Sequence, residues 1–157
     1  MHKSSPATSH ESSAQPAAPG LLRRLAAIIY DGLLLIALLA IVSLPFVMQV
    51  GEQSINSNPL LLLVFRLIHL LTMFLFFGWF WTHGGQTLGM RAWRLRAEKI
   101  DGTTMDWRAS LKRFFAALLS WLGLGLGYLW ILVDKDKMAW HDRLSGTRLV
   151  LIERKKR

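Results

Sequence analysis

The chain has 157 residues, of which 52% are hydrophobic, and it carries a formal net charge of +9 at pH 7. Its apolar residues lie in long blocks with the charges between them, whereas a water-soluble domain would intersperse the two at helix or strand period. This pattern excludes an ordinary soluble domain, and the absence of cysteine excludes disulfides.

The N-terminal segment, residues 1–20, is rich in serine, proline and alanine and has no apolar periodicity. We therefore expect a disordered tail there. A membrane domain is expected over residues 21–152, followed by a basic tail at residues 153–157. Arg23 and Arg24 lie near the start of this domain, and we interpret the pair as the charged flank of a membrane helix rather than as a twin-arginine signal.

Three apolar runs follow, Leu25 to Val50, Leu60 to Trp81 and Phe114 to Val133. A helix needs about 20 mostly apolar residues to cross a bilayer core of about 30 Å, and each run approaches or exceeds this length. The sequence therefore predicts an all-α membrane protein in which the first two runs are transmembrane helices.

The distribution of basic residues predicts how these helices are oriented. The connection from Gln49 to Pro59 has no lysine or arginine, whereas the segments after Trp81 and after Val133 are strongly basic. Because short basic segments stay in the cytoplasm, we expect both termini on the cytoplasmic side.

The third run, taken together with the residues just before it (Leu111–Val133), has two interpretations. A full crossing would export the basic tail, and Gly123, Gly125 and Gly127 each cost about 1 kcal/mol in a helix relative to alanine. We therefore predict a glycine-broken hairpin, either re-entrant or built from two half-spans, with helices at Ala109–Leu122 and Tyr128–Asp134.

The alternative for this run uses the same glycines in a continuous helix. Gly123 and Gly127 are four residues apart, which is the small-xxx-small spacing that lets two membrane helices approach closely. In that case the glycines would form a helix–helix contact face.

The segments outside the apolar runs predict a small cytoplasmic sheet. Apolar and charged residues alternate over Ala92–Ile100, and Asp101-Gly102 is a favoured hairpin turn, so we predict a β-hairpin with a second strand at Thr103–Trp107. A further strand is predicted at Thr147–Ile152. Basic side chains around this sheet would face anionic lipid head groups.

Four ionisable residues lie in or beside the apolar helices. A carboxylate such as Asp31 costs about 2.5–3.5 kcal/mol inside a membrane helix, so it is expected to be paired or functional. Arg24 lies seven residues earlier on the same face, about 10 Å along the axis. In the second run, His69 lies about one turn above the level of Asp31 and could approach it, whereas Arg66 is expected to extend toward the outer surface.

These charges again allow two interpretations. In the first, Arg24, Asp31 and a cytoplasmic partner hold the helices in register. In the second, Asp31 is a proton or cation site. We expect no enzyme, metal or cofactor, because the sequence lacks a nucleophile motif, paired carboxylates and metal-ligand spacing.

Three segments, RRLAAIIYDGLLL, GGQTLGMRAWRLRAEKIDGTTMDW and WHDRLSGTRLVLI in that order, resemble the RDD family of bacterial membrane proteins. The family is named for an arginine at the start of the first helix, an aspartate in its middle and a later aspartate. The resemblance assigns these roles to Arg24, Asp31 and Asp142. It implies the bacterial inner membrane, and transport has been suggested for the family, with sodium–proton exchange attributed to some members.

Two functions therefore follow as expectations. One is a multi-pass inner-membrane protein in transport, with cation–proton exchange through Asp31. The other is a non-transporting interaction or assembly protein whose arginine and aspartate residues are structural. The expected partners are the lipid bilayer, through its anionic head groups, and either further copies of this chain in a homo-oligomer or other membrane proteins. Nucleic acid is not expected as a partner.

Overall fold

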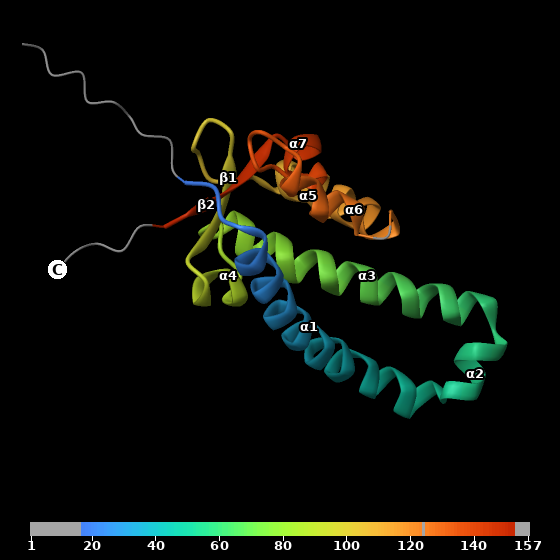
Figure 1. The fold of residues 1–157 in the computed structure, drawn as a ribbon. Coiled ribbons are helices and arrows are strands. Elements are labelled where there is room, and N and C mark those ends of the chain that lie inside the picture. The colour runs from blue at the N-terminus through green and yellow to red at the C-terminus, as the bar shows by residue number, and fades with distance from the viewer. Residues whose placement is uncertain (1–16, 124, 153–157) are drawn as a thin grey trace, which may run out of the picture.

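The computed structural model describes residues 17–123 and 125–152. The predicted basic tail at residues 153–157 and most of the predicted N-terminal tail lie outside these residues. Figure 1 shows two long helices extending from a smaller unit of short helices and a two-stranded sheet. The elements are α1 (Leu21–Val50), α2 (Glu52–Ser57), α3 (Pro59–Thr82), α4 (Leu88–Ala92), β1 (Leu95–Lys99), α5 (Trp107–Leu122), α6 (Leu126–Leu129), a 3-10 helix (Trp130–Leu132), α7 (Trp140–Ser145) and β2 (Thr147–Leu151).

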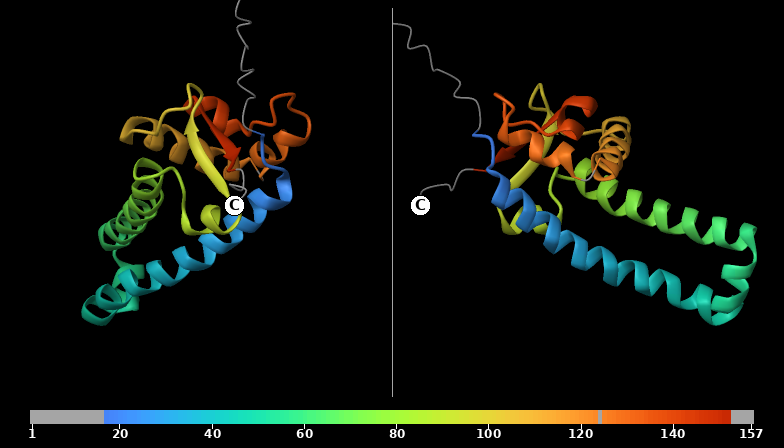
Figure 2. Two further views of the ribbon diagram at one scale, coloured as in Figure 1. Left: turned by 90° about the vertical axis from the view of Figure 1, so that its left-hand side faces the viewer. Right: turned by 45° about the vertical axis from the view of Figure 1, so that its right-hand side comes forward.

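The helices α1 and α3 correspond to the first two apolar runs, which confirms them as helices. They have 30 and 24 residues, and both are long and apolar enough to cross a membrane. Gly51 ends α1, and α2 connects the two helices at the end far from the sheet (Figures 1 and 2). The Asn58 side chain accepts hydrogen bonds from the Leu60 and Leu61 amides and Pro59 occupies the first turn, which together fix the start of α3.

The third apolar run forms a broken helical pair, as predicted. Helix α5 ends at Leu122, and α5 and the helical segment after it meet at 107°. Gly125 has φ +77°, and a Cβ added to Gly127 would lie 2.4 Å from the Ser120 Oγ, so glycine is needed at both positions. The alternative of a continuous helix is therefore wrong. If the bent pair counts as one span, the described residues contain three candidate spans, and otherwise two.

The boundaries of this pair differ in part from the prediction. Helix α5 starts at Trp107 because the Asp106 side chain accepts a hydrogen bond from the Ala109 amide at 2.7 Å. The second half begins at Leu126, two residues earlier than predicted, and only α6, which ends at Leu129, is α-helical, because a 3-10 turn follows it.

The predicted β-hairpin is wrong. The turn at Asp101-Gly102 forms, since the Lys99 amide donates to the Thr103 carbonyl. The chain after the turn enters α5 instead of returning as a strand, because Asp106 caps that helix. Strand β1 pairs antiparallel with β2, with Leu95 opposite Leu151. The predicted strand near the C-terminus is thus confirmed, and it is the partner of β1.

The core lies where the sheet, α4, α5 and one end of α1 and α3 meet (Figure 2). The amide of Leu151 donates to the Ala17 carbonyl, so the segment before α1 runs beside β2. The two ends of the described chain therefore lie together at the sheet. The buried apolar residues of this core are Ala27, Trp81, Met90, Leu95, Ala97, Met105, Ala109, Phe114 and Leu149.

Candidate functional site

Asp142 is the centre of a buried ionic cluster. Its side chain is fully buried, and its Oδ2 accepts hydrogen bonds from Arg24 Nη1 at 2.8 Å and from the Ala139 amide at 3.0 Å. Its Oδ1 lies 2.7 Å from Arg113 Nη1. Since α7 begins at Trp140, Asp142 lies in its first turn, where a carboxylate is favoured. One carboxylate therefore faces two guanidinium groups.

The two arginines connect this cluster to the rest of the fold. Arg24 also donates to the carbonyl of Lys137 at 2.7 Å and to that of Pro19 at 3.3 Å. Arg113 donates to Thr147 Oγ1 at 2.5 Å, and its guanidinium lies 5.4 Å from the centre of the Trp81 ring. Through these contacts α1, α3, α5, α7 and β2 all converge at one point.

The protonation states at this point follow from burial and from the two cations. Burial alone would raise the pKa of Asp142, but the attraction of Arg113 and Arg24 outweighs it and holds the pKa below its ordinary value. His141 Nε2 lies 3.6 Å from Asp142. Burial and the repulsion of Arg113 lower the pKa of His141 to about 3. With His141 neutral, the cluster carries one surplus positive charge.

Asp31 forms a separate buried site on α1. Its Oδ2 accepts from Thr87 Oγ1 at 2.5 Å, and its Oδ1 accepts from the Gly89 amide at 2.8 Å. The Thr87 hydroxyl also accepts from the Met90 amide and so caps α4. A Cβ on Gly89 would lie 2.4 Å from the Ala27 carbonyl oxygen, so the approach of α4 to α1 requires glycine. Asp31 therefore anchors α4 against α1.

The structure brings together some of the residues singled out from the sequence and separates others. Arg24 and Asp142 form an ion pair, whereas Asp31 has its own partners on α4. His69 does not reach Asp31, because its Nε2 lies 2.7 Å from Ser43 Oγ and its Nδ1 lies near a backbone carbonyl of α3. Arg66 is exposed.

Three residues of these sites were missed by the sequence analysis. Arg113 was counted only as one of the basic residues flanking the third run, although it stands next to the apolar stretch FFAALL. Thr87 and Gly89 lie in GGQTLGMR, and a threonine at the start of a short helix is the signal that could have indicated a cap.

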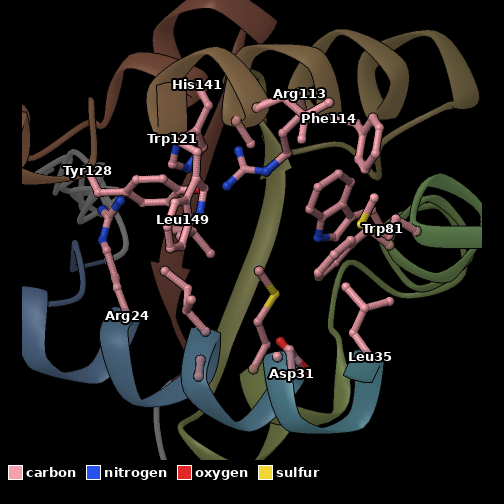
Figure 3. Close-up of a pocket in the computed structure, with 18 of the residues that line it drawn as sticks. Arg24, Asp31, Leu35, Trp81, Arg113, Phe114, Trp121, Tyr128, His141 and Leu149 are labelled. Atoms are coloured by element: carbon pink, nitrogen blue, oxygen red, sulfur yellow. The ribbon is translucent and has the colours of Figure 1, made fainter. Parts of the chain in front are cut away.

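A cavity of about 330 Å³ lies between the two aspartate sites (Figure 3). Arg24, Arg113 and His141 line one end of it, and Asp31 lies in the wall formed by α1. Most other wall residues are apolar or aromatic, and they come from α1, α3, α4, α5, α6 and both strands. Among residues 17–123 and 125–152, no group of three or more side chains is arranged to hold a metal ion.

Two comparisons with known proteins found matches. The model of the RDD family matches residues 18–146, which include Arg24, Asp31 and Asp142. "Uncharacterized protein RP437" of Rickettsia prowazekii (strain Madrid E) is 27% identical over 111 residues, which are 71% of this chain and 62% of that protein. The chain thus spans less than two thirds of the length of this relative. No solved structure matches the chain at a significant level.

Proposed function

Since this chain belongs to the RDD family, we propose that it is a multi-pass protein of the bacterial inner membrane that binds other membrane components and does not move ions. One observation supports this choice over transport. The three residues that correspond to the family's name, Arg24, Asp31 and Asp142, are all buried, and their contacts hold separate elements of the fold together.

The contacts of Asp31 argue for a structural role. A carboxylate in a membrane helix is expected to be functional or paired, and the partners of Asp31 favour the second role. Both oxygens of Asp31 accept hydrogen bonds from α4, and the Gly89 backbone packs directly against it. Loss of these bonds would weaken the attachment of α4 to α1, so a cation that displaced them would disturb the packing of the fold.

The exposed surfaces of the long helices support binding within the bilayer. Leu33, Ile36 and Ile41 of α1 are each about two-thirds exposed (65%, 66% and 69%), and α3 has a similar row of leucines. Such a surface suits lipid chains, other membrane proteins or a second copy of this chain. Near the sheet, exposed arginines that include Arg91 and Arg108 suit anionic head groups on the cytoplasmic side, where we place both termini.

The second candidate function is cation–proton exchange through Asp31. It is favoured by the position of Asp31, a carboxylate in an apolar helix that also lines the cavity. The two candidate functions predict different effects of replacing the Asp31 carboxylate: a loss of stability for the structural role and a loss of ion flux for exchange.

The test is proton flux in vesicles that contain the purified chain and a pH-sensitive dye, with sodium or potassium added outside. We expect wild-type vesicles to match protein-free vesicles, and Asp31→Asn to lower the unfolding temperature, because Asn would present an N–H group to one of the donors on α4. Wild-type flux that Asp31→Asn abolishes at an unchanged unfolding temperature would contradict the proposal and support exchange.

The orientation has its own test. A reporter fused after Arg157 should be active in the cytoplasm, since the basic segments are expected on that side. Activity on the periplasmic side would refute the proposed topology.

A further inference from the structure

Among the described residues, the wall of the cavity contains three buried nitrogens without a hydrogen-bond partner, of which His141 Nδ1 can donate or accept and the other two can only donate. Trp81 Nε1 and Arg113 Nε have no hydrogen-bond partner among the residues that the structure describes. Trp81 is 6% exposed and Arg113 is 2% exposed. Figure 3 shows the two side chains reaching from α3 and α5 toward the same space. Since both groups can only donate, they select for a ligand that has an acceptor oxygen.

The charge at this end of the cavity favours an anion. Arg24 and Arg113 share the single carboxylate of Asp142, so one positive charge is uncompensated next to a mostly apolar space. A buried charge of this kind attracts a counter-charge strongly, because the surroundings screen it little. We therefore expect the negatively charged group of a ligand to bind at the end of the cavity that contains Arg113.

The other carboxylate in the wall limits where that group can lie. Asp31 is seven residues after Arg24, about 10 Å farther along the axis of α1. Its oxygens already accept from Thr87 and Gly89. An anion close to Asp31 would be repelled, so the head of the ligand is confined to the Arg113 end.

The remainder of the cavity suits an alkyl chain. Leu35, Met73, Phe77 and Leu118 line it, and they provide no charge and no strong hydrogen-bonding group. A volume of about 330 Å³ is at the lower end of the range for small-molecule pockets, about 300–1,000 Å³. This size favours one chain over two.

We propose that the cavity binds a single-chain anionic amphiphile of the fatty-acid class. Its acidic head accepts hydrogen bonds from Trp81 Nε1 and Arg113 Nε, and its tail lies along Leu35, Met73 and Phe77. This inference does not depend on the function proposed above, since it follows from the cavity alone.

The test uses the full chain in phosphatidylcholine nanodiscs and a dodecanoate that carries a diazirine in its tail. Photolabelling should map to peptides of α1 and α3 that line the cavity. Unlabelled dodecanoate should compete, and dodecanol should compete at least about tenfold less well, because it lacks the charge that the arginines attract. Phosphatidylglycerol added to the nanodiscs should not compete.

Two variants locate the ligand. Trp81→Phe removes one donor and keeps the ring, so dodecanoate affinity should fall about tenfold, and dodecanol affinity should fall less, because its neutral oxygen accepts a weaker hydrogen bond. In Gly32→Leu the new side chain points into open space, since an added Cβ meets no atom within 4 Å, and it should fill the cavity and prevent labelling. Ala40→Leu, exposed on the same helix and away from the cavity, is the matched control and should be labelled like the wild type.

Three results would overturn the proposal. Equal competition by dodecanol would show that the charged end is not used. Wild-type labelling of Gly32→Leu, with an unchanged unfolding temperature, would place the ligand outside the cavity. Equal competition by phosphatidylglycerol would replace the single-chain ligand with a phospholipid.

Discussion

The substitution Asp142→Asn tests whether the ionic cluster holds the fold together. It would remove the only carboxylate that contacts Arg24 and Arg113 among the described residues, at distances of 2.8 and 2.7 Å, and would leave two buried positive charges facing each other. Breaking a buried ion pair by removing one partner costs about 3–5 kcal/mol. With about 2–4 °C lost per kcal/mol at this chain length, we expect the unfolding temperature to fall by about 6–20 °C.

The assay is thermal unfolding of the purified chain in mild detergent, followed by tryptophan fluorescence. Asp136→Asn is the matched control, because Asp136 pairs with Arg143 at 2.8 Å but its side chain is 66% exposed, and such pairs contribute less than about 1 kcal/mol. The double variant Arg24→Met with Asp142→Asn restores the surplus of one positive charge and should recover part of the loss. If Asp142→Asn unfolds within about 2 °C of Asp136→Asn, the cluster does not stabilise the fold as argued.

Three further predictions concern stability. Gly89→Ala should unfold at a lower temperature than wild type because its Cβ would overlap the α1 backbone, whereas Gly32→Ala, which has open space, should be neutral or stabilising; the reverse order would refute the close packing of α4. Gly127→Ala should likewise destabilise the turn after α5, and wild-type stability would contradict it. The pKa of His141 lies near 3 in the fold and near 6.5 in the unfolded chain, so the unfolded chain binds the proton first as the pH falls. Chemical denaturation should therefore show the free energy of unfolding falling by up to about 1.4 kcal/mol per pH unit between about pH 6 and pH 3. His141→Gln should reduce this pH dependence.

The long helices could be predicted from the sequence because length and hydropathy determine them locally. The same holds for the break near Gly125, where three alternating glycines disfavour a continuous helix. The error at Thr103–Trp107 came from the turn at Asp101-Gly102, which is as compatible with a loop as with a hairpin. The chain after the turn enters α5, because the Asp106 side chain accepts a hydrogen bond from the Ala109 amide and caps that helix.

The site was harder to predict because its contacts join distant parts of the chain. The residues of the Arg24–Asp142 pair are 118 positions apart, and Asp31 and Gly89 are 58 apart. The resemblance to the family identified Arg24, Asp31 and Asp142 without indicating their partners. Arg113 gave no distinct signal, since an arginine beside an apolar run usually faces lipid head groups.

The separation between Arg24 and Asp142 also has a consequence for biosynthesis. At about 5–20 residues per second, the ribosome needs about 6–24 s to make the 118 residues between them. During that time the nascent chain carries an arginine near the start of its first helix without the carboxylate that neutralises it. The start of the first helix can therefore be fixed by this ion pair only after the segment that contains Asp142 has been translated, and a nascent chain that stops before Asp142 keeps the Arg24 guanidinium without its carboxylate.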